Sequence, residues 1–361
     1  MAFALNTYPV TFRSRFSGGK WNSEYIEKPH RTPEEEAAMS EKDRAALESS
    51  RNNYDDMPLV NYTSQYGLAC FEGLKAFPQK NGSLAIFRPD RNAARFARSM
   101  EGLCMPPFPQ ESFVSACIET VKRNAALGFL ARYRDEWEKD SFMTADSIYI
   151  RPFTISEGGI GVNLSREPYV MVINTPVSAY FSSDSCDAVV TDRIRATPKG
   201  TGWIKACSNY VISALAKSEA LKDGYMECVF LDATYRSYIE EGSSCNIFFY
   251  LKSGELVTPE LGDTILPGIT RESIIELARD KGMKVSQRKI SIDEALEETK
   301  ECFVSGTAAG ATPICSLTYH GKKVQFNGGR TGALTSDIRD TIKGIQYGRL
   351  PDTKGWLVPV V

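Results

Sequence analysis

Residues 200–207 have the sequence Gly200-Thr201-Gly202-Trp203-Ile204-Lys205-Ala206-Cys207, in which one lysine stands among small and apolar neighbours. Apolar surroundings favour the neutral amine, and the neutral amine is the form that condenses with carbonyl compounds. The ordinary alternative is a lysine whose ammonium group stays in water while its aliphatic stem lies on the protein. Lys205 is therefore a candidate nucleophile that needs support from the rest of the chain.

The composition is that of an ordinary globular protein. The chain has 361 residues, of which 42% are hydrophobic and 24% charged, and its formal net charge is −2. This length predicts two domains, with a single large α/β domain as the alternative. The near-neutral charge disfavours a nucleic-acid-binding surface. No apolar run is long enough for a membrane-spanning helix. We therefore expect neither nucleic acid nor a membrane among the partners.

Cysteine usage bears on the compartment. There are nine cysteines, an odd number, and no Cys-x-x-Cys pair, which favours a reducing environment. We expect a cytoplasmic protein. The first twenty residues lack acidic side chains and carry Arg13, Arg15 and Lys20. That composition keeps a mitochondrial presequence open if the source is eukaryotic.

Histidine is scarce, which narrows the chemistry. His30 and His320 are the two histidines of the chain, and both stand in polar, loop-like sequence. A Ser-His-Asp triad, a Cys-His dyad and a His-rich metal site are therefore disfavoured, and we expect no metal. Proton transfer then falls to Lys, Tyr, Asp or Glu, or to a cofactor.

The chain mixes strands and helices without a regular βαβα order, which favours an α+β fold. The hydrophobic patterns predict strands at 84–88, 147–154, 169–173, 229–231 and 246–250. A helix after Lys205 should end at Gly224, with an apolar face made of Val211, Ala214, Leu215 and Leu221. We predict an N-terminal domain at 1–175, a linker at 176–186 and a C-terminal domain at 187–361.

Two short segments are candidates for holding a phosphate. Leu266-Pro267-Gly268-Ile269-Thr270 ends where a helix is predicted to start, and a helix N-terminus attracts anions. Ser305-Gly306-Thr307-Ala308-Ala309-Gly310 follows an apolar strand, and its small residues allow a ligand to approach the backbone closely. Neither segment is a Walker A loop or a dinucleotide fingerprint, and each by itself is also compatible with an ordinary turn.

Taken together, the segments resemble the branched-chain-amino-acid aminotransferases, which are class IV aminotransferases with the pyridoxal 5'-phosphate (PLP) fold of type IV. The resemblance runs from about Asn61 to near the C-terminus. Its landmarks occur in the family's order: Tyr66-Gly67-Leu68-Ala69-Cys70-Phe71-Glu72-Gly73-Leu74-Lys75, Phe87-Arg88-Pro89 with Arg95, Tyr149-Ile150-Arg151-Pro152, Lys205 with Asn209-Tyr210, Glu241-Gly242 with Asn246, Leu266-Pro267-Gly268-Ile269-Thr270-Arg271, and Ser305-Gly306-Thr307-Ala308-Ala309.

The resemblance implies a cofactor site for PLP. Lys205 matches the lysine that binds PLP covalently and shuttles a proton, and Glu241 matches the carboxylate that pairs with the ring nitrogen. Tyr210 matches the tyrosine that bonds to the ring oxygen. Arg95, rather than Arg88, matches the arginine that binds the phosphate. The backbone N–H groups of Ile269 and Thr270, together with Thr307, would complete the phosphate site.

The resemblance also implies a substrate pocket. Tyr66, Phe71 and Tyr149 match the aromatic walls around an aliphatic side chain. The backbone turn at Ala308 and Ala309, next to Thr307, matches the place that receives the substrate α-carboxylate. Arg151 matches an arginine near the pocket that could accept the distal carboxylate of glutamate.

Three positions depart from the family pattern. The usual Gly-Gly-Asn-Tyr is here Cys207-Ser208-Asn209-Tyr210, so two side chains stand where backbone is normally bare. Gln65 replaces a common histidine. The redox Cys-x-x-Cys of some animal relatives is missing, because that region has the sequence Ala309-Gly310-Ala311-Thr312. None of these changes removes a catalytic group.

The resemblance implies a two-domain enzyme with a smaller N-terminal and a larger C-terminal domain. It would transfer the amino group of L-leucine, L-isoleucine or L-valine to 2-oxoglutarate, and would act as a homodimer. Another type IV enzyme, such as a D-amino-acid aminotransferase or aminodeoxychorismate lyase, is the nearest alternative. A non-catalytic binding protein on the same scaffold is a second alternative, and it predicts no covalently bound cofactor.

Overall fold

The computed structural model describes residues 5–178, 186–307 and 310–360. Its contacts divide the chain into two compact units. The first unit comprises residues 1–179, 205–208 and 345–361, and the second comprises residues 180–204 and 209–344. The chain therefore passes from the second unit into the first and back again around Lys205.

The first unit is built on a seven-stranded antiparallel sheet in the order β16-β4-β3-β5-β6-β1-β2. Its strands are β1 (Val10–Ser17), β2 (Lys20–Glu27), β3 (Leu74–Pro78), β4 (Leu84–Phe87), β5 (Ser147–Ile155), β6 (Tyr169–Val177) and β16 (Leu357–Pro359). Its helices are α1 (Pro33–Ala38), α2 (Glu41–Asn52), α3 (Tyr62–Tyr66), α4 (Pro89–Gly102), α5 (Gln110–Ala126) and the 3-10 helix η1 (Asp135–Asp140).

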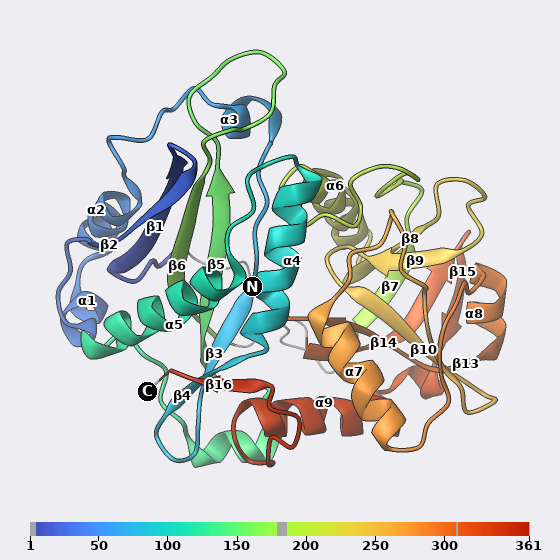
Figure 1. The fold of residues 1–361 in the computed structure, drawn as a ribbon. Coiled ribbons are helices and arrows are strands. Elements are labelled where there is room, and N and C mark those ends of the chain that lie inside the picture. The colour runs from blue at the N-terminus through green and yellow to red at the C-terminus, as the bar shows by residue number, and fades with distance from the viewer. Residues whose placement is uncertain (1–4, 179–185, 308–309, 361) are drawn as a thin grey trace. The chain divides into compact units, whose positions relative to one another are not determined.

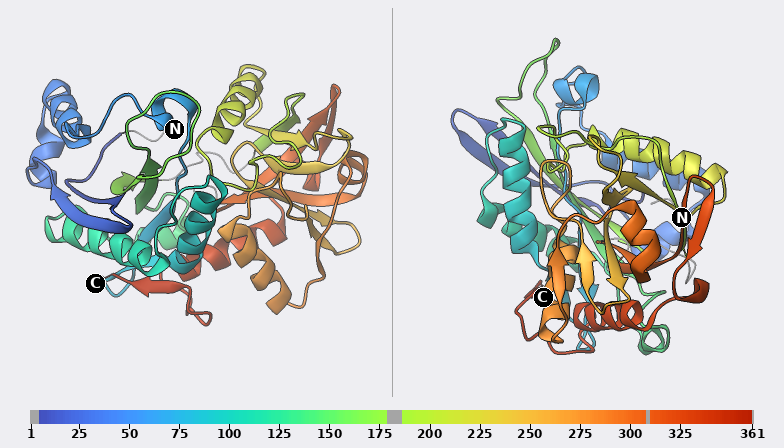
Figure 2. Two further views of the ribbon diagram at one scale, coloured as in Figure 1. Left: turned by 45° about the horizontal axis from the view of Figure 1, so that its top comes forward. Right: turned by 90° about the vertical axis from the view of Figure 1, so that its right-hand side faces the viewer.

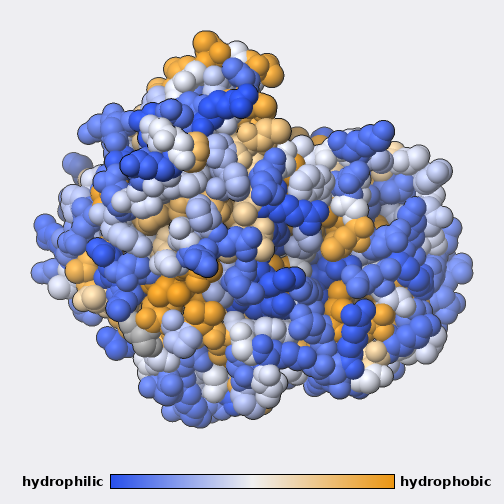
Figure 3. All heavy atoms as spheres, in the orientation of Figure 1, coloured by the Kyte–Doolittle hydropathy of each residue, from blue (hydrophilic) through white to orange (hydrophobic). Residues whose placement is uncertain are grey.

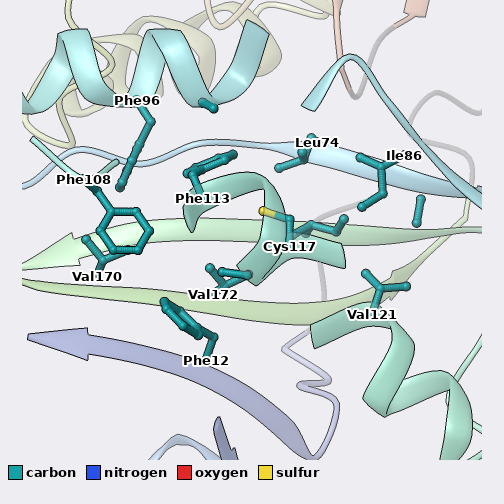
Figure 4. Packing of buried hydrophobic residues seen from close by; sticks show 14 of the residues in the cluster. Phe12, Leu74, Ile86, Phe96, Phe108, Phe113, Cys117, Val121, Val170 and Val172 are labelled. Atoms are coloured by element: carbon teal, nitrogen blue, oxygen red, sulfur yellow. The ribbon is translucent and has the colours of Figure 1, made fainter. Parts of the chain in front are cut away.

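Helices α4 and α5 cover one face of this sheet (Figure 1). Phe96 of α4 and Phe113, Cys117 and Val121 of α5 meet Val172 and other strand side chains (Figure 4). All of these side chains are fully or almost fully buried. This core makes α4 and the strands a rigid frame for the polar residues that they carry.

The second unit is built on a nine-stranded mixed sheet in the order β12-β11-β10-β13-β14-β7-β8-β9, with β15 paired to β14. Its strands are β7 (Cys186–Val190), β8 (Glu227–Leu231), β9 (Ile239–Gly242), β10 (Asn246–Leu251), β11 (Leu256–Thr258), β12 (Val285–Gln287), β13 (Thr299–Gly306), β14 (Gly310–Tyr319) and β15 (Lys322–Gln325). Its helices are α6 (Asn209–Lys222), α7 (Ile269–Asp280), α8 (Ile292–Glu298), the 3-10 helix η2 (Asn327–Gly329) and α9 (Ala333–Gln346), whose last two residues belong to the first unit.

The predicted apolar face of α6 is wrong. Val211, Leu215 and Leu221 are exposed, with Val211 at 63%. The helix instead buries Ser213, Ala216 and Ala220, and the two alanines pack against Cys228 and Phe230 of β8. A helix that lies close to a sheet needs small residues at the contact. Its larger apolar residues therefore lie on the exposed face of the helix. The predicted end at Gly224 agrees with the structure, where that glycine has φ +84°.

The two units also depart from the predicted domain ranges. The C-terminal strand β16 pairs with β4 in the first unit, and Figures 1 and 2 show it beside that strand. Ala206 likewise forms a bridge with Cys70. These long-range pairings make the unit that holds the N-terminus the larger one, whereas the smaller was expected there. The predicted linker falls partly on β6 and β7, and its central residues 179–185 lie outside the described part.

The described residues contain no helix that combines the length and the hydropathy needed to cross a membrane.

Candidate active site

Lys205 lies in a short extended segment that pairs with residues 69–71. The Phe71 N–H donates to the Lys205 carbonyl at 3.1 Å, and the Cys207 N–H donates to the Ala69 carbonyl at 2.8 Å. The Lys205 N–H donates to Ser99 Oγ of α4 at 3.2 Å. Both backbone groups of Lys205 are thus held by the first unit, so the position from which its side chain starts is fixed.

In the first unit, Phe71 lies beside the Lys205 amine, and Arg151 lies next to Phe71 and Tyr149. Lys205 Nζ lies 4.8 Å from the centroid of the Phe71 ring. The Arg151 guanidinium lies 4.5 Å from the same centroid and donates from Nη2 to Tyr149 Oη at 2.9 Å. The structure therefore brings Lys205, Phe71, Tyr149 and Arg151 together, as the sequence predicted. Tyr66 stands apart on α3, where its hydroxyl accepts from the Gly161 N–H at 3.0 Å.

The close approach of Tyr149 requires a glycine at position 73. A Cβ atom on Gly73 would lie 2.2 Å from Tyr149 Oη. Carbon and oxygen cannot approach to that distance without a bond, so any side chain there would displace Tyr149. Gly73 thus keeps room for one of the predicted pocket walls.

Arg95 forms a buried ion pair with Glu72. Arg95 Nε donates to Glu72 Oε1 at 2.7 Å and Nη2 donates to Oε2 at 2.8 Å, which is the bidentate geometry that guanidinium and carboxylate favour. Asn92 Nδ2 adds a hydrogen bond to Oε2 at 2.7 Å. The side chain of Glu72 is fully buried and that of Arg95 is 9% exposed. Glu72 therefore fixes the orientation of the arginine that was predicted to bind phosphate.

The charge state of Glu72 depends on these partners. Burial by itself raises the pKa of Glu72, but the charge and hydrogen bonds of Arg95, the charge of Lys205 and the hydrogen bond from Asn92 together bring it below its usual value. Glu72 is therefore an anion at neutral pH. It links Arg95 to Lys205 electrostatically, a connection that no sequence motif indicated.

Arg88 has a different environment from Arg95. It precedes α4 with φ 49°, and its guanidinium lies 5.0 Å from the centroid of the Trp356 ring. Its N–H donates to the Trp356 carbonyl at 2.7 Å. Arg88 thus joins the start of α4 to the C-terminal segment.

In the second unit, Glu241 is the last residue but one of the buried strand β9 and forms an ion pair with Arg195. Arg195 Nε is 2.5 Å from Glu241 Oε1, and the side chains of this pair are 6% and 4% exposed. Asn246 Nδ2 donates to Glu241 Oε2 at 3.3 Å and to the Leu266 carbonyl at 2.9 Å. Asn246 thereby connects the carboxylate to the segment that leads into α7. Arg195 lies outside every motif that was recognised in the sequence.

The start of α7 has the properties of an anion site. Gly268 is the N-cap and supplies no side-chain hydrogen bond, and Ile269 and Thr270 are the first two helical residues. The first N–H groups of a helix have no acceptor within it, and the helix dipole is positive there. A Cβ on Gly268 would lie 1.9 Å from Asn246 Oδ1, so glycine is required. Arg271 packs into the same turn, where burial lowers its pKa to about 10.

The motif Asn209-Tyr210 opens helix α6. Asn209 accepts from Thr201 Oγ1 at 2.7 Å and donates to the carbonyls of Thr201 at 2.7 Å and Ile204 at 3.0 Å. These bonds hold the loop at 201–204, and Tyr210 follows in the first turn of the helix. Thr307 stands in the turn after β13. Ala308 and Ala309, predicted to receive the substrate carboxylate, lie outside the described residues.

Cys207 and Ser208, which stand in place of the usual Gly-Gly, add two side chains to this segment. A Cβ on Gly67 would lie 3.3 Å from Ser208 Cβ, so glycine at 67 accommodates the serine. Burial raises the pKa of the Cys207 thiol, while the charges of Arg151 and Lys205 oppose that rise. Cys207 is therefore a neutral thiol near the predicted pocket.

The side chains present are suited to PLP. Within the first unit, an amine lies beside an aromatic ring, and a buried arginine is held by Glu72. Taken by itself, the second unit has a buried carboxylate, and its helix α7 starts without a side-chain cap. These groups match the aldehyde, the ring nitrogen and the phosphate of the cofactor. Glu241 is buried beside Arg195, and a carboxylate buried this deeply needs cationic partners to stay charged.

Comparison with known proteins identifies the family. Residues 69–317 match the family model described as amino-transferase class IV, and the chain belongs to this family. A branched-chain-amino-acid aminotransferase of Mycolicibacterium smegmatis is 39% identical over 304 residues, which cover 81% of this chain and 80% of that protein. Within the class, this chain is a member of the branched-chain-amino-acid aminotransferases, which are PLP-dependent enzymes.

Solved structures agree with this assignment. The branched-chain amino acid aminotransferase of Escherichia coli is 27% identical and superimposes with a TM-score of 0.74, covering 99% of this chain and 100% of that one. The enzyme of Thermobaculum terrenum in its PLP form is 28% identical with a TM-score of 0.71, covering 85% of this chain and 94% of that one. The predicted type IV fold, the aminotransferase class and the PLP cofactor are thus confirmed.

Proposed function

We propose that this enzyme transfers the amino group of L-leucine, L-isoleucine or L-valine to 2-oxoglutarate, giving the branched 2-oxo acid and L-glutamate, with Lys205 as the residue that binds PLP. The observation that carries the residue assignment is the position of the Lys205 amine, beside the Phe71 ring and close enough to Glu72 to lower the pKa of that carboxyl group. The identity to branched-chain relatives supports the substrates.

Each predicted cofactor residue has a distinct task. PLP, when bound, supplies an aldehyde that accepts the amino group and a ring that withdraws electrons from the substrate α-carbon. Lys205 holds the cofactor and moves the proton to and from that carbon. Glu241 accepts a hydrogen bond from the ring nitrogen, and Tyr210 donates to the ring oxygen. Arg95, the N–H groups of Ile269 and Thr270, and the Thr307 hydroxyl bind the phosphate.

Different residues bind the apolar and the polar parts of the substrates. Tyr66, Phe71 and Tyr149 offer aromatic surface to the aliphatic side chain. Arg151 binds the distal carboxylate of glutamate and 2-oxoglutarate. Thr307, Ala308 and Ala309 receive the α-carboxylate. One pocket can then accept both an apolar and an acidic substrate.

Borohydride reduction of PLP-loaded protein followed by peptide mapping tests the assignment of Lys205. The label is expected on the peptide that contains Lys205. Titration with L-leucine should convert the visible band of the lysine-bound cofactor into that of the amine form, whereas D-alanine and aminodeoxychorismate should not. A label on another lysine would refute the assignment of Lys205. Conversion of the band by D-alanine alone would refute branched-chain L-amino acids as the substrates.

Replacing Arg151 by glutamine should separate the two substrates. We expect the KM for 2-oxoglutarate to rise about 10- to 100-fold, the equivalent of one lost hydrogen bond to a charged group, and the KM for leucine to change less than about threefold. Steady-state kinetics with each substrate varied in turn measures both constants.

The control for Arg151 is Tyr149→Phe, which removes the 2.9 Å hydrogen bond from Arg151 but keeps the aromatic ring. If Arg151 only braces the aromatic walls, both variants should raise the two KM values together. That result would assign Arg151 to structure instead of to substrate binding.

We also propose that the enzyme is a homodimer. In the first unit, large apolar side chains are exposed around α3 and in the loop between β5 and β6, among them Leu59 at 87%, Ile160 at 79% and Val162 at 91%. Figure 3 shows orange spheres at the top of the view, where Figure 1 places α3 and that loop. Exposed apolar groups that gather in one place favour association with another protein surface.

Replacing Val162 by aspartate is expected to shift the dimer towards monomer, because burying an unpaired carboxylate in an apolar contact is costly. Light scattering after size exclusion should give twice the 40.1 kDa of one chain for the wild type and a value near one chain for the variant. Val211→Asp, on the exposed face of α6, is the matched control and should stay dimeric. The reverse outcome would move the interface to α6.

We propose a cytoplasmic location as well. Cys70, Cys117 and Cys228 are fully buried thiols, as a reducing compartment permits. Fluorescent tagging of the full chain in its source cell tests this location, and a signal confined to mitochondria would contradict it.

A further inference from the structure

Arg195 is a buried arginine that no sequence motif marks, yet it contacts the carboxylate assigned to the cofactor. It follows β7 in the segment that leads to the loop at 201–204. Its Nε lies 2.5 Å from Glu241 Oε1, and both side chains are almost fully withdrawn from solvent. A pair this deeply buried is not a surface ion pair of negligible effect.

The other nitrogens of Arg195 are held by backbone carbonyls. Nη1 donates to the Thr264 carbonyl at 2.8 Å, and Nη2 donates to the Gly202 carbonyl at 3.2 Å. The three nitrogens of the guanidinium thus contact three separate segments. Because the group is planar and its nitrogens are fixed relative to one another, these contacts also fix the position of Nε beside Glu241.

Glu241 is held from both sides. Arg195 contacts Oε1, and Asn246 donates to Oε2 at 3.3 Å. A guanidinium has no acceptor atom, so it favours the ionised carboxylate over the neutral acid. Each oxygen of a carboxylate has two acceptor directions, so an ionised carboxylate can accept from several donors at once.

From this geometry we infer that Arg195 is a positioning residue that keeps Glu241 ionised and oriented as the acceptor for the protonated ring nitrogen of PLP. The inference rests on the proposed role of Glu241. If Glu241 were a neutral acid, the ring nitrogen would face a proton donor and would lose the ionic partner that favours its protonated form. In this role Arg195 acts through Glu241.

Infrared difference spectra of the full-length, PLP-free protein at neutral pH test the charge of Glu241 directly. The wild type should lack a protonated-carboxyl band that depends on Glu241. Arg195→Gln should gain one, and the band should vanish in Arg195→Gln with Glu241→Gln. The matched control is Arg236→Gln, since the guanidinium of Arg236 donates to the carbonyls of Arg193, Leu231 and Thr191, and its removal should produce no band that depends on Glu241. A band in neither variant, or in both, would overturn the inference.

A double-mutant cycle for PLP binding distinguishes a positioning role of Arg195 from a purely structural one. Glu241→Gln and Arg195→Gln should each weaken PLP binding about tenfold or more, and the double variant should be no weaker than Glu241→Gln alone, because the two residues act as one unit. Additive losses would overturn the role of Arg195 and leave that of Glu241 intact. An unchanged PLP affinity in Glu241→Gln would instead refute the proposed role of Glu241.

Arg195→Lys provides a second test that does not depend on whether Arg195→Gln folds. Lysine restores the positive charge but lacks the planar set of donors for the two carbonyls. We expect no protonated-carboxyl band, and PLP binding closer to that of the wild type than to that of Glu241→Gln. If Arg195→Lys binds PLP as weakly as Glu241→Gln while Glu241 stays ionised, the charge of Arg195 is not what matters and the inference fails.

Discussion

Replacing Lys205 by alanine is expected to lower kcat for leucine and 2-oxoglutarate by about 10⁴-fold or more, the upper end of what a positioned acid–base group contributes. The substitution removes both the covalent attachment of the cofactor and the amine that carries the proton. Initial rates at saturating substrate measure the loss, and the visible band of the lysine-bound cofactor should be absent.

Two further measurements distinguish this role from a general loss of structure. Lys222→Ala removes an exposed lysine at the end of α6 and should leave kcat unchanged. A small primary amine added to Lys205→Ala should restore part of the rate, since it can carry the same proton. A Lys205→Ala enzyme within about tenfold of the wild-type rate would show that another group moves the proton.

Replacing Glu72 by glutamine is expected to reduce the free energy of unfolding by about 3 to 5 kcal/mol, as is usual when one member of a buried ion pair is removed. Arg95 would stay buried but would lose the negative charge that now makes the bidentate contact with it. Urea denaturation of the PLP-free protein near neutral pH measures the loss.

The same variant carries a prediction for pH. The pKa of Glu72 in the folded protein lies below its usual value, although burial alone would raise it, because Arg95 and Lys205 favour the charged form. The stabilisation is therefore complete above the pKa of the unfolded chain and is lost as the pH falls through the lower, folded-state pKa. The difference between wild type and Glu72→Gln should be constant near neutral pH and shrink below about pH 4.

Glu119→Gln is the matched control for Glu72. It makes the same chemical change in the exposed pair of Glu119 with Arg123 on α5, where side chains are 36% and 49% exposed. Such a pair contributes only about 0.3 to 0.5 kcal/mol. Equal losses in the two variants would contradict a special role for the buried pair.

Local elements with strong patterns were predictable. The strands expected at 147–154 and 169–173 correspond to β5 and β6, and the helix expected after Pro267 corresponds to α7. Alternating and helical periodicities depend only on residues that are close in the chain, so they survive folding unchanged. The face of α6 was not predictable in this way, because the close packing of Ala216 and Ala220 against β8 decides which face is buried.

Some residues of the candidate site were predicted from the sequence, and others were missed. Lys205, Phe71, Tyr149 and Arg151 were expected together, and the structure brings them together in the first unit. The roles of Glu72 and Arg195 were missed. Glu72 stands within a recognised motif, so its position beside Phe71 was a usable signal, whereas Arg195 offered none.

By itself, the sequence determined which reactive groups this enzyme carries and in what order, because motif residues and local periodicity are properties of neighbouring positions. Only the tertiary structure decided which charges balance one another: Glu72 with Arg95, and Glu241 with Arg195. It also decided that β16 and the segment around Lys205 join the N-terminal unit. The physical reason is that strand register and burial bring distant residues into contact, and a buried charge is stable only where such a contact supplies its partner.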